Sequence, residues 1–185
     1  PLTTGFVFME KGGVVSIEAQ HVGECRNASD ASWKIIPGLG RSLSGIALFP
    51  YTASVENAWL KYRMNLNTQA DSVDVYLTVA AVMPFLKGGH QVALSLDGGE
   101  EVVVNLNQNL NWEHKYDLMY PTAAARVIQN KVRLRLDKKN KGEMHSLQLR
   151  PLQPGIVFEK IEVDCGGGYV PSRLGMPESS YRLEK

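Results

Sequence analysis

The sequence has 185 residues, of which 44% are hydrophobic and 21% are charged, and its formal net charge is +1. This length fits one domain with a sizeable core, and the ordinary composition excludes a disordered or fibrous chain. The near-neutral charge lacks the basic excess of a general nucleic-acid-binding protein. No apolar run approaches the roughly 20 residues that span a bilayer, so a membrane partner is not expected.

Segments that alternate apolar and polar residues dominate the chain. Such alternation is typical of β-strands with one face on a core. A loop is expected at residues 23–32, where small and polar residues prevail. We expect strands at residues 14–19, 33–36, 45–50, 58–66, 71–81, 91–96, 101–106, 131–136, 145–149 and 156–165.

The last of these segments, 156–165, and the first, 14–19, share a related cadence and are predicted to pair. Asp97-Gly98-Gly99 separates two alternating segments and predicts a β-hairpin. An antiparallel, all-β sandwich follows from these features. We expect a single domain over residues 1–185, with a core at 14–170 and a surface tail at 171–185.

Strand periodicity fails between residues 107 and 130. Two short stretches there suit helical turns, and Pro121 separates them. We therefore expect an ordered helical excursion over about residues 112–129.

Candidate catalytic residues are few. No Gly-x-Ser-x-Gly nucleophile elbow is present, and the histidines have no metal-binding spacing. Carboxylate pairs for glycoside hydrolysis occur by chance among 19 acidic residues, so the number alone indicates nothing. A small carboxylate-dependent glycosidase is kept as one hypothesis.

Glu18 and Asp164 form the least arbitrary carboxylate pair, because each lies on one of the two strands expected to meet. Hard oxygen ligands on adjacent strands can hold Ca²⁺. The sequence therefore suggests one structural calcium ion and no required cofactor. The alternative is that both carboxylates are solvated or hydrogen-bonded at the sheet margin.

Aromatic side chains in the expected loops can stack on sugar rings, because each combines an apolar face with a polar tip. The alternative for tryptophan in a sandwich is a place in the core. The candidate carbohydrate-binding residues are Trp33, Tyr51, Trp112, Tyr116 and Tyr120.

A basic hairpin is a second candidate surface, for an acidic sugar or another polyanion. The alternative is a solvated strand edge whose charges discourage aggregation. Its residues are Arg133, Arg135, Lys138, Lys139 and Lys141.

Cys25 and Cys165 each follow one of the terminal strands expected to pair, so both a disulfide and two free, buried thiols are open at this point. Pro1–Thr4 shows neither the basic start nor the apolar core of a signal peptide. A mature or excised chain is expected, and the sequence does not distinguish the two.

Four separated motifs, in order over about residues 14–179, resemble the C-terminal domain of glycoside hydrolase family 115, the xylan α-1,2-glucuronidases. In the last motif, Arg173 and Met176 stand where a tyrosine and a proline are expected. The motifs are Ser16–His21 (SIEAQH), Ala31–Arg41 (ASWKIIPGLGR), Pro154–Asp164 (PGIVFEKIEVD) and Pro171–Ser179 (PSRLGMPES).

The resemblance implies a jelly-roll, galactose-binding-like β-sandwich attached to a larger extracellular or periplasmic hydrolase of the α-glucuronidase type. Its catalytic residues would lie in upstream domains, which would be partners of this non-catalytic domain, together with xylan or another plant polysaccharide. The alternative is an autonomous carbohydrate-binding module.

The first strand also resembles that of calcium-containing carbohydrate-binding modules of families 6 and 35. In those modules a Glu at the position of Glu18 and an acidic residue on the last strand help to bind a structural ion. Gln20 stands where they often carry a second Glu.

Overall fold

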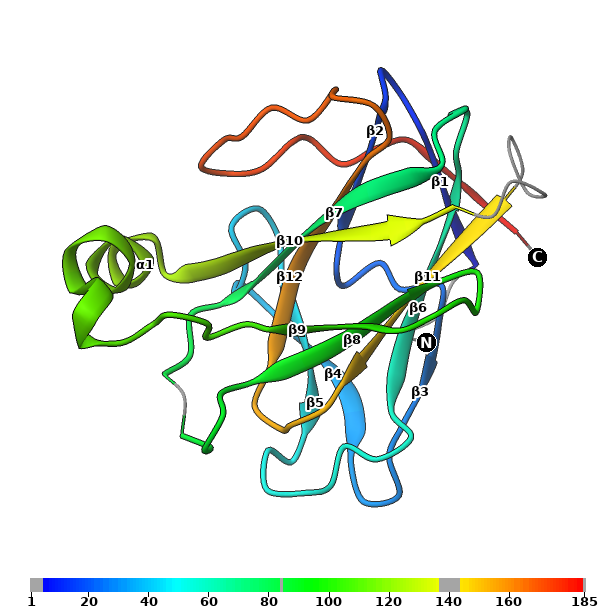
Figure 1. Cartoon of the computed structure of the whole chain (residues 1–185). Helices are drawn as coiled ribbons and strands as arrows, with labels where there is room; N and C mark the ends of the chain where they lie inside the picture. The colour runs from blue at the N-terminus through cyan, green and yellow to red at the C-terminus, as the bar shows by residue number, and fades with distance from the viewer. Residues whose placement is uncertain (1–4, 84, 137–143, 185) are drawn as a thin grey trace.

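The computed structural model describes residues 5–83, 85–136 and 144–184. Two β-sheets pack face to face in this part of the chain, and short helical turns project to one side (Figure 1). The β-sandwich predicted from the strand periodicity is thereby confirmed.

The first sheet has the strand order β13-β1-β6-β11-β8-β9, and β3 pairs with β6 beside β1. Its neighbouring strands are antiparallel except for β1 and β6, which are parallel. The strands are β1 (Phe6–Met9), β3 (Glu24–Arg26), β6 (Trp59–Asn65), β8 (Gln91–Leu96), β9 (Val102–Asn105), β11 (Met144–Pro151) and β13 (Tyr181–Leu183).

The second sheet has the order β10-β7-β12-β5-β4, and β2 pairs with the same edge of β12 as β5 does. All its described pairs are antiparallel. The strands are β2 (Val14–Glu18), β4 (Ser32–Ile36), β5 (Gly45–Phe49), β7 (Ser72–Ala80), β10 (Val127–Arg135) and β12 (Val157–Asp164).

Alternation explains the core between the sheets. On β6, Leu60, Tyr62 and Met64 are fully buried, whereas the residues between them are half-buried on the outer face. The Tyr62 hydroxyl donates a hydrogen bond of 2.7 Å to the carbonyl of Ala19, so this buried phenol is satisfied. The core is therefore lined by one face of each sheet.

The predicted meeting of the first and last sandwich strands is confirmed, because β2 and β12 pair with Ile17 opposite Ile161. The expected hairpin at Asp97-Gly98-Gly99 is also confirmed by the pairing of β8 with β9. Asp97 and Gly98 both have positive φ, the conformation that such a tight turn requires.

Several boundaries differ from the expectation. The helical excursion comprises η1 (Trp112–His114), η2 (Lys115–Met119) and α1 (Tyr120–Ala125), so residues 127–129 belong to β10 instead. The expected loop at 23–32 contains β3. β1 and β13 lie outside the expected core at 14–170, yet both are strands of the first sheet.

Residues 169–179 form a segment that we call the strap, because it crosses the outer face of the second sheet before the chain enters β13. Tyr169 stacks on Tyr76 of β7 with a centroid distance of 3.8 Å. Ser179 exchanges hydrogen bonds with Ser16 of β2 through its hydroxyl and its amide. In Figure 1 this segment runs in orange and red from β12 past β2 toward β1.

Candidate functional site

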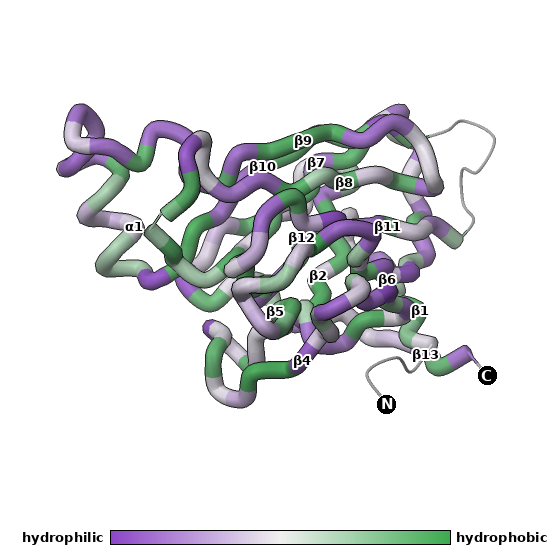
Figure 2. The backbone as a smooth tube through the Cα atoms, turned by 90° about the horizontal axis from the view of Figure 1, so that it is seen from below, coloured by the Kyte–Doolittle hydropathy of each residue, from purple (hydrophilic) through white to green (hydrophobic). Residues whose placement is uncertain are grey.

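The helical excursion stands apart from the sandwich, at the end opposite to β1 and β13 in both Figure 1 and Figure 2. Asn111 caps η1 by accepting hydrogen bonds from the amides of Glu113 and His114 at 3.0 and 3.3 Å. Pro121 suits the first turn of α1, and Arg126 ends this helix with φ of 60°. No residue of these turns is buried.

Three predicted aromatic residues gather on this excursion. The exposed fractions of Trp112, Tyr116 and Tyr120 are 73%, 72% and 51%. The rings of Tyr116 and Tyr120 meet edge to face with centroids 5.4 Å apart. Lys115 Nζ lies 6.0 Å from the Trp112 centroid and 4.6 Å from the Tyr116 centroid. The structure thus assembles an exposed aromatic surface beside one ammonium group, which we call the aromatic surface.

The other two predicted aromatic residues lie elsewhere. Trp33 is only 2% exposed and packs on Phe158, and its Nε1 donates to the Arg26 carbonyl at 2.8 Å. The expectation that Trp33 contacts sugar is therefore wrong, because its ring is in the core. Tyr51 is 38% exposed on the turn after β5, and its described ring contact is with Phe49 at 4.3 Å.

A buried charged cluster lies beneath the strap. Lys160 Nζ donates to Glu18 Oε1 at 2.9 Å, and both side chains are 5% exposed. The Ser42 hydroxyl donates to the same carboxylate oxygen at 2.5 Å. Lys160 is opposite Glu18 in the pairing of β12 with β2, so strand register brings the two charges together.

The strap closes over this cluster through backbone and side-chain contacts. Glu162 accepts a hydrogen bond of 2.6 Å from the amide of Met176. Glu178 accepts from the amide of Glu18 at 2.9 Å and contacts His21 Nδ1 at 2.8 and 3.0 Å. The hydrogen bond to Glu178 raises the pKa of His21 despite the opposing effect of burial.

Two further carboxylates in this region have an unpartnered oxygen. Glu159 and Glu162 are 4% and 0% exposed, and Oε2 of each has no hydrogen-bond partner. Burial raises the pKa of both carboxyl groups. Protonation would relieve the cost of these buried charges.

The structure does not bring Glu18 and Asp164 together. Asp164 lies opposite Val14, four positions along the strand from the Lys160 and Glu18 pair, and its Oδ1 accepts from the amides of residues 166–168. Within the described residues, no three His, Cys, Asp or Glu side chains are grouped so as to hold a metal ion. The calcium site expected between Glu18 and Asp164 therefore does not fit the geometry.

A signal for the charged cluster was present in the sequence but was missed. Strict alternation after Phe158 would place residue 160 on the core side of β12. The next core-facing residues are instead Ile161 and Val163, so one extra residue lies between Phe158 and Ile161. A register irregularity of the ladder lies at this point, between Phe158 and Lys160. Two adjacent charged residues between apolar ones therefore mark the bulge that turns Lys160 outward, toward the strap.

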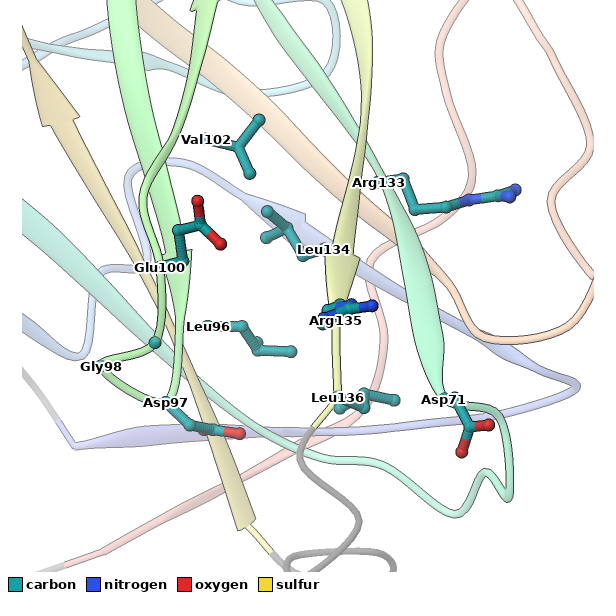
Figure 3. Close-up of a pocket in the computed structure, with 11 residues that line it drawn as sticks. Asp71, Leu96, Asp97, Gly98, Glu100, Val102, Arg133, Leu134, Arg135 and Leu136 are labelled. Carbon is teal, nitrogen blue, oxygen red and sulfur yellow. The ribbon is translucent and has the colours of Figure 1, made fainter.

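A cavity of about 880 Å³ opens between the β8–β9 hairpin and β10 (Figure 3). Leu96, Val102, Leu134 and Leu136 form its apolar part. Asp97 lies at its margin but is already paired with His145 Nδ1 at 2.7 Å and the Ser146 amide at 2.8 Å.

The basic hairpin is described only in part. Arg133 binds Asp74 through two hydrogen bonds of 2.8 and 3.0 Å, and these, together with the Lys131 ammonium group at 2.9 Å, lower the pKa of Asp74 to about 2. Arg135 is exposed at the cavity. The remaining residues of the hypothesis, Lys138, Lys139 and Lys141, lie outside the described residues.

Cys25 and Cys165 are free thiols in this structure, which decides between the two alternatives left open by the sequence. Burial raises the pKa of the Cys165 thiol to about 12, so this group is a poor nucleophile near neutral pH. Among the described residues, none of the helices is long and apolar enough to traverse a bilayer.

Comparison with known proteins gives a family match and several structural matches. The Glycosyl hydrolase family 115 C-terminal domain matches residues 7–178. A family GH115 4-O-methyl-α-glucuronidase, described as specific for decorated arabinogalactans, superposes with a TM-score of 0.55 and 19% identity. The match covers 77% of this chain and 17% of that protein, so the chain spans only a small part of the glucuronidase. No curated protein matches the chain.

Two carbohydrate-binding modules share the fold. The C-terminal family 6 module of LamC, a laminarinase from Zobellia galactanivorans, has a TM-score of 0.51 and 14% identity over 82% of this chain and 98% of that one. The family 35 module from Clostridium thermocellum has a TM-score of 0.52 and 13% identity over 80% and 97%. At such identities these matches establish the β-sandwich fold alone.

Proposed function

This chain belongs to the C-terminal domains of glycosyl hydrolase family 115, and we propose that it is a non-catalytic accessory domain of an α-glucuronidase-type enzyme that contacts polysaccharide through its aromatic surface. The small share of the matched glucuronidase that the chain covers, 17%, supports placing the catalytic residues in other domains. The expected location is extracellular or periplasmic, where such a substrate would be met.

One observation carries the polysaccharide contact. Trp112, Tyr116 and Tyr120 expose more than half of their surface on one excursion that has no buried residue. Contiguous exposed apolar patches often mark interaction or ligand-binding sites. The faces of these rings can stack on the apolar faces of pyranose rings, and Lys115 can pair with a uronate carboxylate.

The position of the aromatic surface supports the same function. It lies at the end of the sandwich remote from β1 (Figures 1 and 2), and the sandwich leaves its rings exposed. An extended polysaccharide can therefore reach it without any rearrangement of the two sheets.

Affinity electrophoresis of the 185-residue chain tests the polysaccharide contact. Gels would contain glucuronoxylan, unsubstituted xylan or arabinogalactan, with a polysaccharide-free gel as the reference. We expect retardation that Trp112→Ala or Tyr116→Ala weakens about fivefold each, since one stacked ring contributes about 1 kcal/mol. Preferential retardation by glucuronoxylan over plain xylan would indicate that the uronate contributes to binding, as expected if its carboxylate pairs with Lys115.

Tyr51→Ala is the matched control, because it removes an aromatic ring that is exposed on a different turn. Its retardation should equal that of the unchanged chain. Absence of retardation in all three gels, or full retardation of a Trp112→Ala, Tyr116→Ala double variant, would contradict the aromatic surface as a polysaccharide contact.

A small glycosidase is the competing function, and the cavity in Figure 3 is where it would act. Incubating the chain alone with aldouronic acids tests this directly. We expect no hydrolysis above the uncatalysed rate. Turnover that is abolished by Glu100→Gln, which changes a carboxylate lining the cavity, would contradict the non-catalytic assignment.

A further inference from the structure

The Lys160 ammonium group joins three separate segments of the chain. It lies 2.9 Å from Glu18 Oε1 of β2, 3.4 Å from Ser42 Oγ in the loop between β4 and β5, and 3.4 Å from the carbonyl of Leu174 in the strap. A lysine ammonium has three donors and no acceptor. Three oxygen acceptors therefore match its donor capacity, although the residue is only 4% exposed.

The residues around Lys160 provide a hydrogen-bonded setting for its ammonium group and space for its aliphatic stem. Ser42 accepts from Lys160 and donates to Glu18 Oε1, which closes a triangle of hydrogen bonds. Gly175 of the strap has φ of +75°, and a Cβ at this position would lie 2.9 Å from Lys160 Cδ. Glycine thus allows the strap backbone to lie directly on the lysine stem.

We propose that the Lys160 ammonium is a built-in cation, which performs in this domain the cross-linking that a structural Ca²⁺ would provide. It holds the first sandwich strand, the loop at residues 37–44 and the strap together, so that the native fold is independent of calcium.

Charge and ligand number support this assignment. Ca²⁺ takes six to eight oxygen ligands and needs carboxylates to offset its two charges. Here Glu18 is the carboxylate that pairs with the Lys160 ammonium group, whereas Glu162 accepts from the Met176 amide and burial raises its pKa. The neighbouring Gln20 is neutral and contacts His21 at 3.2 Å. Asp164 Oδ1 already accepts hydrogen bonds from the backbone amides of Gly167 and Gly168. The Lys160 ammonium group already lies within hydrogen-bond distance of Glu18 Oε1. A divalent ion bound to the same carboxylate would lie close to this ammonium group, and the two cations would repel each other.

Thermal melts of the 185-residue chain in calcium and in chelator test the proposal. A calcium ion bound at a hundred times its dissociation constant would raise the melting temperature by roughly 5–10 °C in a chain of this size. We expect the two melting temperatures to agree within about 1 °C, because the lysine already fills the cation's place. A calcium-dependent rise that Glu18→Gln abolishes would overturn the proposal.

The lysine itself is tested with Lys160→Met, which keeps the length of the stem and removes the charge. Glu18 then keeps the Ser42 hydroxyl as a donor but loses the ammonium group that offsets its buried charge, so the melting temperature should fall by roughly 10 °C. Hydrogen exchange of the Met176 and Ser179 amides, which bond to Glu162 and Ser16, should accelerate relative to the β8–β9 hairpin. Unchanged stability and strap protection would overturn the cross-linking role.

Lys131→Met is the control, because Lys131 also pairs with a carboxylate, Asp74, but is half-exposed on β10, the edge strand of the same sheet. It should leave the melting temperature and strap exchange nearly unchanged. If Lys160→Met does not fold, the double variant Lys160→Met, Glu18→Gln replaces it. Because that variant removes the charge of Glu18 together with that of Lys160, it should fold and still show faster strap exchange. Native strap protection in the double variant would contradict the proposal.

Discussion

The outer face of the second sheet and the helical excursion use side chains in opposite ways. Beneath the strap, Glu18, Lys160 and Glu162 are charged and yet nearly completely buried, and their contacts hold the chain's own segments together. On the excursion, Trp112 and Tyr116 are apolar and yet nearly three-quarters exposed. Each region thus places residues where their transfer free energy disfavours them.

The difference separates internal structure from available recognition. Beneath the strap, Glu18 and Lys160 pair with each other and Glu162 Oε1 accepts from the Met176 amide, so much of the cost of burying these groups is offset within the fold. The exposed rings of the excursion are not covered by the sandwich, and their apolar area remains available to a ligand. We therefore expect substitutions on the second sheet to change stability, and substitutions on the excursion to change binding.

Trp33→Ala should have the largest effect on stability. Trp33 packs on Phe158 on the inner side of the second sheet and is almost fully buried, so its loss leaves a large cavity. The free energy of unfolding should decrease by about 3–5 kcal/mol. Chemical denaturation with tryptophan-independent detection, such as circular dichroism, measures this change. A loss below about 1 kcal/mol would show that the second sheet does not depend on this core contact.

Glu178→Gln should destabilise the strap by an intermediate amount, about 1–2 kcal/mol at pH 6. His21 loses a charged acceptor, whereas the backbone amide of Glu18 can still donate to the side-chain oxygen of the glutamine. The pKa of His21 is raised in the folded chain, so this stabilisation is complete below the unfolded value of 6.5 and is lost as pH rises through the folded value. Melts at pH 6 and pH 8 measure it.

The difference between the unchanged chain and Glu178→Gln should therefore be larger at pH 6 than at pH 8. Glu159 and Glu162 also have raised pKa values, but both proteins contain these residues, so their contribution cancels. An equal difference at both pH values would mean that the His21 charge does not hold the strap.

Most of the fold was predictable because the relevant pattern is local. On β6 and β7 an apolar residue at every second position is enough to identify a strand and its core face. β3 and β13 were missed because each has three residues, with no buried side chain, and so contains no full period. Their strand character comes from pairing with β6 and β1, which are distant in sequence.

The candidate sites were predictable only where local structure decides exposure. Trp112, Tyr116 and Tyr120 lie where strand periodicity fails, and the structure exposes all three. Trp33 could not be placed in this way, since its burial depends on Phe158, which is distant in sequence. The pairing of Glu18 with Lys160 depends likewise on strand register and on a bulge, and register is a property of two strands together.

Arg133→Ala should have a small effect although its ion pair is bidentate. Arg133 is 69% exposed, and exposed pairs contribute about 0.2–1 kcal/mol. The pKa of Asp74 should rise from about 2 toward its ordinary value of 3.8, with Lys131 Nζ still at 2.9 Å. Carboxyl titration by nuclear magnetic resonance measures the pKa. No change in it would show that Lys131 alone holds the Asp74 charge.

Trp112→Ala should have the smallest effect on stability, within about 0.5 kcal/mol, because the side chain is 73% exposed and its cap residue Asn111 is retained. Since the same substitution should weaken retardation by polysaccharide, it separates folding from binding within one variant. Trp33→Ala is the matched comparison, with the same side chain removed from the core. If Trp112→Ala lowered the unfolding free energy by as much as Trp33→Ala, the exposed ring would be a structural element of the excursion, and its effect on retardation would have to be attributed to unfolding.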